Sequence, residues 1–260
     1  MLHLFFDYNK HWNNMRIAVI SDIHGNIEAF KTVLKDIERK AVNQIISLGD
    51  NIGYGADSEA VIQQIIASRI PSILGNHELA CVNKKVYKWY IGDTKRSLDD
   101  TLSKLSPSSI DYLKGLTVNL SKYQAFFVHG FWPDSVRHYL HQIPDSELLH
   151  AFGQIKESIC FLGHTHRLSL IFPEDGNIQV QPLNPGLTQL EKNNKYMVNA
   201  GSVGQPRDGD PRAKYVIWDT EKHCLDIRYI DYDNQTAAQK ILAAGLPFKY
   251  AQVVNPDIKK

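Results

Sequence analysis

The sequence contains few cysteines, no long apolar run and almost no net charge. Its three cysteines are an odd number without paired spacing, which excludes a disulfide-built scaffold and predicts a reduced, cytoplasmic protein. Because no apolar run reaches the length that spans a bilayer, we expect no membrane-spanning segment. The formal net charge is +1, and nucleic-acid-binding proteins usually carry a clustered excess of basic residues. Nucleic acid is therefore excluded as the expected partner.

The first fourteen residues differ from the rest of the chain. Their apolar stretch is short and lacks a small-residue cleavage site, so they make a poor signal peptide. Met15 then opens directly on the first strong strand. We expect either that Met15 is the natural start or that residues 1–14 form a loosely attached arm. Residues 15–260 are expected to form one domain.

Short β-branched apolar runs alternate with amphipathic segments in the first part of the chain. Such runs are typical of strands buried on both faces of a sheet, and the segments between them carry apolar residues at helical spacing. The expected strands are 16–21, 44–49 and 71–74, and the expected helices are 27–40 and 58–68, with Ser58 as N-cap. This β-α-β-α-β order predicts a parallel, layered α/β core.

The later part of the chain interrupts and then changes this pattern. Residues 79–122 are predicted to be a mostly helical insertion, with Ser106-Pro107 opening one helix. Strands then resume around a helix at 144–155, and Cys160 is expected to be buried in one of them. After residue 168 the segments indicate five antiparallel strands. A short helix follows within residues 237–247, where Gly245 and Pro247 are expected to stop it.

Five apolar runs end in the same way, with a small residue followed by Asp, Asn or His. They are RIAVISDIHGN (16–26), QIISLGDN (44–51), SILGNHE (72–78), AFFVHG (125–130) and ICFLGHTH (159–166). Ligands of open α/β sheets bind beyond the carboxyl ends of the strands. If the runs are neighbouring strands, these polar side chains therefore meet along one edge.

The side chains at these ends suit divalent transition metals. The set is Asp22, His24, Asp50, Asn76, His77, His129, His164 and His166. Nitrogen and oxygen donors without thiolate favour Mn, Fe, Zn, Co or Ni over calcium or a structural zinc. Taken alone, Asp50 could be a helix N-cap, and Asn76 favours a turn over a metal ligand. The complete set favours a pair of ions, which clamps a phosphate for in-line attack by a bridging hydroxide.

The ordered blocks D-x-H, G-D, G-N-H-E, H-G and G-H-T-H resemble the signature of the calcineurin-like metallophosphoesterase superfamily. Residues 199–219 and the segment AAQKILAAGLP are similar to its small bacterial phosphodiesterase (YfcE-like) branch. The resemblance implies a four-layer α/β/β/α sandwich, in which helices flank two mixed sheets.

The resemblance also implies a role for each strand-end residue. The first metal set would be Asp22, His24 and His166, and the second would be Asn76, His129 and His164. Asp50 would bridge the two ions. His77 would not bind metal but would act as proton donor or phosphate contact. Asn51, after Asp50, departs from relatives that carry another residue there, including an Arg in the protein-phosphatase branch.

Two further residues are candidates for substrate binding. Tyr54 follows the bridging Asp closely in the sequence. Two roles are equally favoured for its side chain: it lines the substrate pocket, or it packs on the next helix. Arg207 lies in a glycine-rich loop that could clamp a phosphate. The alternative is that Arg207 or Arg212 forms a salt bridge with Asp208 or Asp210.

These observations predict a dinuclear-metal-dependent hydrolase of phosphate esters that uses a metal-bridging hydroxide. Manganese is the expected metal, and phosphodiesters or nucleotide-type phosphoanhydrides are the preferred small substrates. One alternative is a phosphomonoesterase, including a serine/threonine protein phosphatase. A second is a non-catalytic metal-binding scaffold, which the complete ligand set disfavours. The fold and the motifs predict the type of reaction, but they do not identify the physiological substrate.

Overall fold

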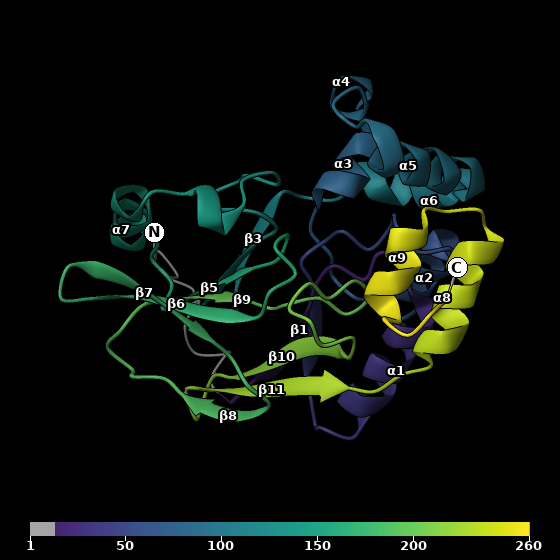
Figure 1. Ribbon diagram of the computed structural model, residues 1–260. Coiled ribbons are helices and arrows are strands. Elements are labelled where there is room, and N and C mark those ends of the chain that lie inside the picture. The colour runs from purple at the N-terminus through teal and green to yellow at the C-terminus, as the bar shows by residue number, and fades with distance from the viewer. Residues whose placement is uncertain (1–13, 260) are drawn as a thin grey trace, which may run out of the picture.

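Two β-sheets pack face to face in the computed structural model, which describes residues 14–259 (Figure 1). One sheet has the order β2 (Gln44–Ser47), β1 (Arg16–Ile20), β10 (Ala213–Asp219), β11 (Cys224–Ile230) and β8 (Gly186–Gln189). The other has the order β3 (Asn119–Lys122), β4 (Ala125–Val128), β5 (Ile159–Leu162), β9 (Tyr196–Asn199), β6 (Ser169–Glu174) and β7 (Asn177–Pro182). The arm expected at residues 1–14 lies outside the described residues, apart from Asn14.

The alternation of side chains in β1 places this strand between two layers. Ile17 and Val19 enter a core shared by both sheets, which also contains Phe127 of β4 and Phe161 of β5. The intervening residues, such as Ile20, enter a second core on the outer face of the same sheet. Successive side chains of a strand point to opposite faces, so β1 is buried on both sides, as its continuous apolar run predicted.

Helices cover the two outer faces. α1 (Ile27–Glu38) and α2 (Ser58–Ala67) pack on the first sheet, and α8 (Asn234–Ala243) packs beside α1. α7 (Asp145–Gln154) covers the second sheet, where its Phe152 shares a core with Cys160 and Met197. The layer order is therefore α/β/β/α, and the expected four-layer sandwich and the burial of Cys160 are confirmed.

The helical insertion lies over one end of this sandwich. It consists of α3 (Asn76–Val82), α4 (Lys84–Tyr87), α5 (Gly92–Lys104) and α6 (Pro107–Lys114), and Figure 1 shows it above α2. Ser106 caps α6 by accepting a hydrogen bond from the backbone N–H of Ser109, as predicted. The helices end at Lys114, so the last residues of the expected insertion belong instead to β3. None of the helices in the described chain is long and apolar enough to cross a membrane.

Several expected elements differ in the structure. The strand expected at 71–74 forms only isolated bridges from Ser72 and Ile73, because Pro71 has no N–H to contribute to a ladder. Asp57 takes the N-cap position of α2, and Ser58 is its first residue. Ser58 instead accepts a hydrogen bond from the Gly53 N–H, which ties the helix to the loop after β2.

The final third of the chain also contains unpredicted features. β9 pairs parallel with β5, so the strands after residue 168 are not all antiparallel. β8 is a short, largely exposed edge strand without an alternating pattern. The last expected helix begins earlier, at Asn234. A further helix, α9 (Phe248–Val254), follows Pro247, which the sequence indicated as an end point.

Candidate metal centre

The polar strand ends meet at one end of the sandwich, but not along one sheet. β1 and β2 belong to the first sheet, whereas β4 and β5 belong to the second. The third run leads into α3, whose first residue is Asn76. The expectation that all five runs are neighbouring strands is therefore wrong. The packing of the two sheets, and not one sheet edge, brings their ends together.

The backbone turns sharply where the strands end. Asp22, His24, Asp50, His164 and His166 all have φ between 48° and 66°, in the left-handed region. This conformation costs about 1–2 kcal/mol for a residue with a side chain. Backbone strain of this kind concentrates at functional sites, where the surrounding fold holds it in place.

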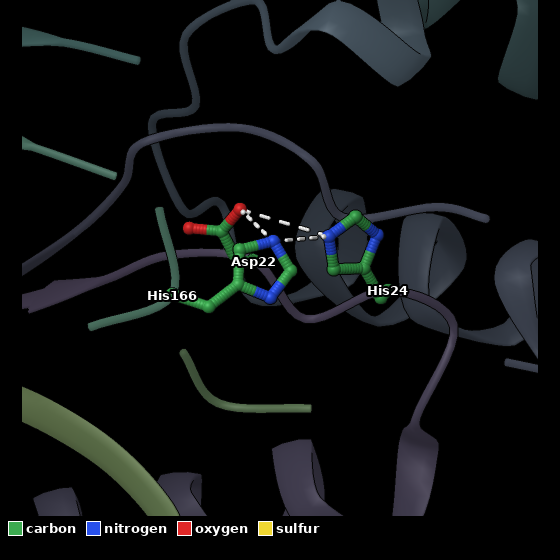
Figure 2. A group of neighbouring side chains, drawn as sticks. All are labelled: Asp22, His24 and His166. Atoms are coloured by element: carbon green, nitrogen blue, oxygen red, sulfur yellow. Dashed lines mark hydrogen bonds and ion pairs between the residues drawn. The ribbon is translucent and has the colours of Figure 1, made fainter. Parts of the chain in front are cut away.

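Asp22, His24 and His166 form the first group (Figure 2). The two imidazole Nε2 atoms lie 3.2 Å apart, and Asp22 Oδ1 is 3.1 Å from His166 Nε2. Asp22 Oδ2 accepts hydrogen bonds from Ser21 Oγ and the His164 N–H. Asp22 Oδ1 is buried and has no hydrogen-bond partner. Because an orphaned buried oxygen is costly, this atom points to a cation among these three side chains.

Asp50, His129 and His164 form the second group, and Asn76 lies among them. One end of the Asn76 amide lies beside His129 Nε2, His164 Nδ1 and Asp50 Oδ2. With the oxygen at this end, the nitrogen donates to Tyr90 Oη and the oxygen is available to a cation. With the amide reversed, its N–H groups would donate to the neighbouring atoms instead. In the first orientation, the donor set fits a metal ion.

Four imidazoles share one hydrogen-bonding arrangement. In each, one ring nitrogen donates to a backbone carbonyl and the other faces its group. The pairs are His24 Nδ1 with Ile52 O, His129 Nδ1 with Leu48 O, His164 Nε2 with Arg137 O, and His166 Nδ1 with Gln205 O. A carbonyl fixes the tautomer because it only accepts, so in a neutral ring the second nitrogen presents its lone pair. This is how metal-binding histidines are usually oriented.

Asp50 lies between the two groups. Its Oδ2 is 3.3 Å from His129 Nε2 and 3.8 Å from His24 Nε2, while Oδ1 accepts from the backbone N–H of His77. Burial raises the pKa of this carboxyl, but the neighbouring imidazoles, His129 first, outweigh it and hold the pKa well below its usual range. The carboxylate is therefore charged and placed to contact both groups.

His77 is adjacent to the groups but is oriented differently. A third possible group contains His24, Asp50 and His77. However, His77 Nδ1 is buried without a hydrogen-bond partner, and no backbone carbonyl fixes its tautomer. Burial lowers its pKa to about 3, although Asp50 opposes this. A Cβ at Gly53 would lie 2.3 Å from His77 Nδ1, so the glycine leaves room for the ring.

Two of the other imidazoles, His164 and His166, are also held in the neutral form that binds metal. Burial lowers the pKa of His164 to about 3 and that of His166 to about 4. His129 differs, because Asp50 outweighs the effect of burial and raises its pKa to about 9. An ion bound at His129 would therefore displace a proton.

Glu78 supports the site, although sequence reasoning assigned it no role. Its buried carboxylate accepts hydrogen bonds from the backbone N–H groups of Asp50, Asn51 and Gly75. Burial, followed by Asp50, raises its pKa to about 7. Asn51, the residue that differs from relatives, is fully buried and accepts a hydrogen bond from Ser47 Oγ. Its role is therefore to support the fold beside Asp50. The GNHE block itself was the available signal for Glu78.

The two candidate substrate contacts have different surroundings. The Tyr54 ring centroid lies 4.5 Å from that of His24 and 4.6 Å from that of His77, so Tyr54 borders the groups. Asp210 pairs with Arg212, and Asp208 pairs with Lys214. Across residues 14–259, no ion pair involves Arg207, whose guanidinium lies 5.7 Å from the Tyr54 ring. The salt-bridge interpretation therefore holds for Arg212.

The chain is similar to several known proteins along most of its length. It is 31% identical over 236 residues to the uncharacterized protein MJ0912 of Methanocaldococcus jannaschii, covering 89% of this chain and 93% of that one. The crystal structure of a metallophosphoesterase from Sphaerobacter thermophilus matches with a TM-score of 0.81 and 28% identity, covering 95% and 100% of the two chains. Protein PH1004 of Pyrococcus horikoshii shares the fold, with a TM-score of 0.72 and 19% identity over 92% and 97% of the chains.

A family model matches residues 15–223, which include every strand-end residue described above. The motif order, the four layers and the two groups of imidazoles and carboxylates agree with this match. The chain therefore belongs to the calcineurin-like phosphoesterase superfamily.

Proposed function

We propose that this protein is a dinuclear-metal-dependent hydrolase of phosphate esters. One observation carries the proposal: buried carboxylate, amide and imidazole atoms converge in two adjacent groups. Asp22 Oδ1 is buried without a hydrogen-bond partner in the first group, and Asp50 Oδ2 and Asn76 Oδ1 both lie beside His129 Nε2 in the second. Leaving Asp22 Oδ1 unpaired costs about 1–3 kcal/mol, which a resident cation would offset.

The proposed ligands follow the two groups. Asp22, His24 and His166 would hold one ion, and Asn76, His129 and His164 would hold the other. Asp50 would contact both, because its Oδ2 lies between His24 and His129. Nitrogen and oxygen donors without thiolate are compatible with manganese, iron, zinc, cobalt and nickel, and manganese is the ion that we propose.

When bound, two divalent cations activate water and offset the charge that gathers on phosphate oxygens during in-line attack. His77 would contact the phosphate without binding metal. Its low pKa leaves the ring neutral, which favours donating a hydrogen bond to a phosphate oxygen over delivering a full proton. Asp50 orients this residue by accepting from its backbone N–H.

The proposed substrates are small phosphodiesters or nucleotide-type phosphoanhydrides. A pocket of about 280 Å³ reaches Asn76 and His164, and Trp89 and Tyr90 of the insertion form part of its lining. A pocket of this size fits a small molecule and is narrow for a protein surface.

The test begins with metal-free protein prepared by chelation. Reconstitution with manganese should give two bound ions per chain and activity on bis(4-nitrophenyl) phosphate. The monoester 4-nitrophenyl phosphate is assayed beside it, and faster cleavage of the monoester would favour a phosphomonoesterase. The absence of hydrolysis with Mn, Fe, Zn, Co or Ni, despite two bound ions, would support a metal-binding scaffold instead.

A further inference from the structure

One pocket beside the metal groups has four large aromatic side chains among its ten lining residues. This aromatic pocket contains Tyr54, Trp89, Tyr90, Arg137 and Tyr139, and it reaches Asn76 and His164. Trp89 is 50% exposed, and the Arg137 guanidinium lies 3.8 Å from its ring centroid. Aromatic rings and guanidinium planes are the surfaces on which nucleobases stack.

A second pocket, which shares Tyr139 with the first, is lined by basic and polar side chains. This cationic pocket, of about 400 Å³, is formed by Tyr139, His141, Gln142, Thr165, Arg167 and Arg207. Arg167 and Arg207 are exposed, and neither forms an ion pair within the described part of the chain. Two unpaired guanidinium groups on one pocket suit a phosphate, which arginine binds through two parallel hydrogen bonds.

Both pockets border the proposed metal ligands. The Tyr139 ring, which they share, stacks on His164 with centroids 4.0 Å apart and planes at 21°. Thr165 of the cationic pocket lies between His164 and His166 in the chain. A phosphorus atom held at the metal groups therefore has one pocket for each of two substituents, one aromatic and one anionic.

We propose that the substrate is a nucleoside that carries at least two phosphates in a chain. Its base stacks in the aromatic pocket, and its outer phosphate binds Arg167 and Arg207. This deepens the proposed function and rests on it. In hydrolysis, a water oxygen bonds to the inner phosphorus, and the bond from that phosphorus to the bridging oxygen breaks. The bridging oxygen keeps the electron pair and takes one water proton, while the other proton passes to solvent.

Binding of three probes tests this proposal independently of turnover. The first probe is α,β-methylene-ADP. It keeps both the nucleoside and the outer phosphate, but its methylene group between the two phosphorus atoms is not hydrolysed. AMP lacks the outer phosphate, and methylenediphosphonate lacks the nucleoside. Isothermal titration of manganese-loaded protein should show that the first binds at least about tenfold tighter than either of the others.

Substitutions then test which pocket binds the nucleoside and which binds the outer phosphate. Trp89→Ala should weaken α,β-methylene-ADP about fivefold or more without affecting methylenediphosphonate. Arg167→Met and Arg207→Met should each weaken α,β-methylene-ADP about tenfold without affecting AMP. Matched controls are Leu187→Ala and Arg39→Met, which change exposed residues outside both pockets.

The outcomes separate this inference from the proposed function. Equal affinity for the three probes, or equal effects of the pocket and control variants, would overturn the assignment of the nucleoside and the outer phosphate to the two pockets. If bis(4-nitrophenyl) phosphate is still hydrolysed, the proposed function stands without it. If the probes and variants behave as expected but no ester is hydrolysed, the two pockets stand and the catalytic role falls.

Discussion

Asp50→Asn should weaken both metal ions at once, whereas Asp22→Asn should weaken only one. Asp50 Oδ2 lies within 3.3 Å of His129 Nε2 and 3.8 Å of His24 Nε2, so it faces both groups. Asp22 Oδ1 faces only the first group. Both carboxyls are buried, and each substitution removes one negative charge without changing the side-chain volume much.

The expected size follows from metal linkage. Each ion held at about 100 times its dissociation constant stabilises the fold by about 2.7 kcal/mol. Two ions therefore supply about 5.4 kcal/mol, or roughly 11–22 °C at about 2–4 °C per kcal/mol. Loss of a supporting partner already costs about 10–100-fold in affinity, so loss of a charged ligand should cost at least about 100-fold. Each affected ion would then stabilise the fold by only about 0.4 kcal/mol.

Differential scanning fluorimetry with and without manganese measures this directly. Comparing the metal-induced rise in Tm within each variant removes any effect of the substitution on the metal-free fold. The rise should be roughly 6–12 °C in Asp22→Asn and about 2–3 °C in Asp50→Asn. Elemental analysis supplies the stoichiometry. Two tightly bound ions in Asp50→Asn, or equal losses in the two variants, would refute the bridging position.

Three further predictions follow from other contacts. His77→Ala should keep two ions and lose about 10²-fold in kcat on good and poor leaving groups alike, since a phosphate contact is removed; a loss confined to poor leaving groups would show that His77 is a proton donor instead. Gly75→Ala places a Cβ 2.2 Å from Asp50 Oδ1 and should abolish tight metal binding measured by titration, while Gly153→Ala, in open space on α7, should raise stability by about 0.5–1 kcal/mol. Burial raises the pKa of Asp36, but hydrogen bonds, from Arg228 first, hold it below 3.8, so this carboxylate stabilises the fold above about pH 4 and loses that effect as pH falls through the folded pKa. Asp36→Asn should therefore cost about 1–2 kcal/mol in urea unfolding at pH 7 and less at pH 3; an equal cost at both would contradict the assignment.

The sequence predicted the layers well because buried strands and amphipathic helices have distinct periods. β1 and α1 match their expected ranges closely for this reason. Local periodicity carries no information about which sheet a strand joins. The division of β2 and β5 between two sheets, and the parallel pairing of β9 with β5, are consequently products of tertiary packing.

The candidate site divides in the same way. Most of its charged and imidazole residues follow strands, and His77 and Glu78 open α3; short sequence motifs mark all of these positions. The wall residues Tyr139 and Trp89 lie in segments without a regular period, so their approach to the site depends on how distant segments fold together. Arg137 illustrates this, because its backbone carbonyl fixes the tautomer of His164 although no side-chain pattern marks it.

Each metal group also draws its members from both sheets, and this has a consequence for how the chain folds. His24 follows β1 and His166 follows β5, 142 positions later, yet their Nε2 atoms lie 3.2 Å apart. An ion bound there would cross-link the sheets and close a loop that spans about half the chain. Neither sheet alone presents a full ligand set, so we expect tight metal uptake only after the two sheets have docked. The rate of metal uptake during refolding would then report on that docking.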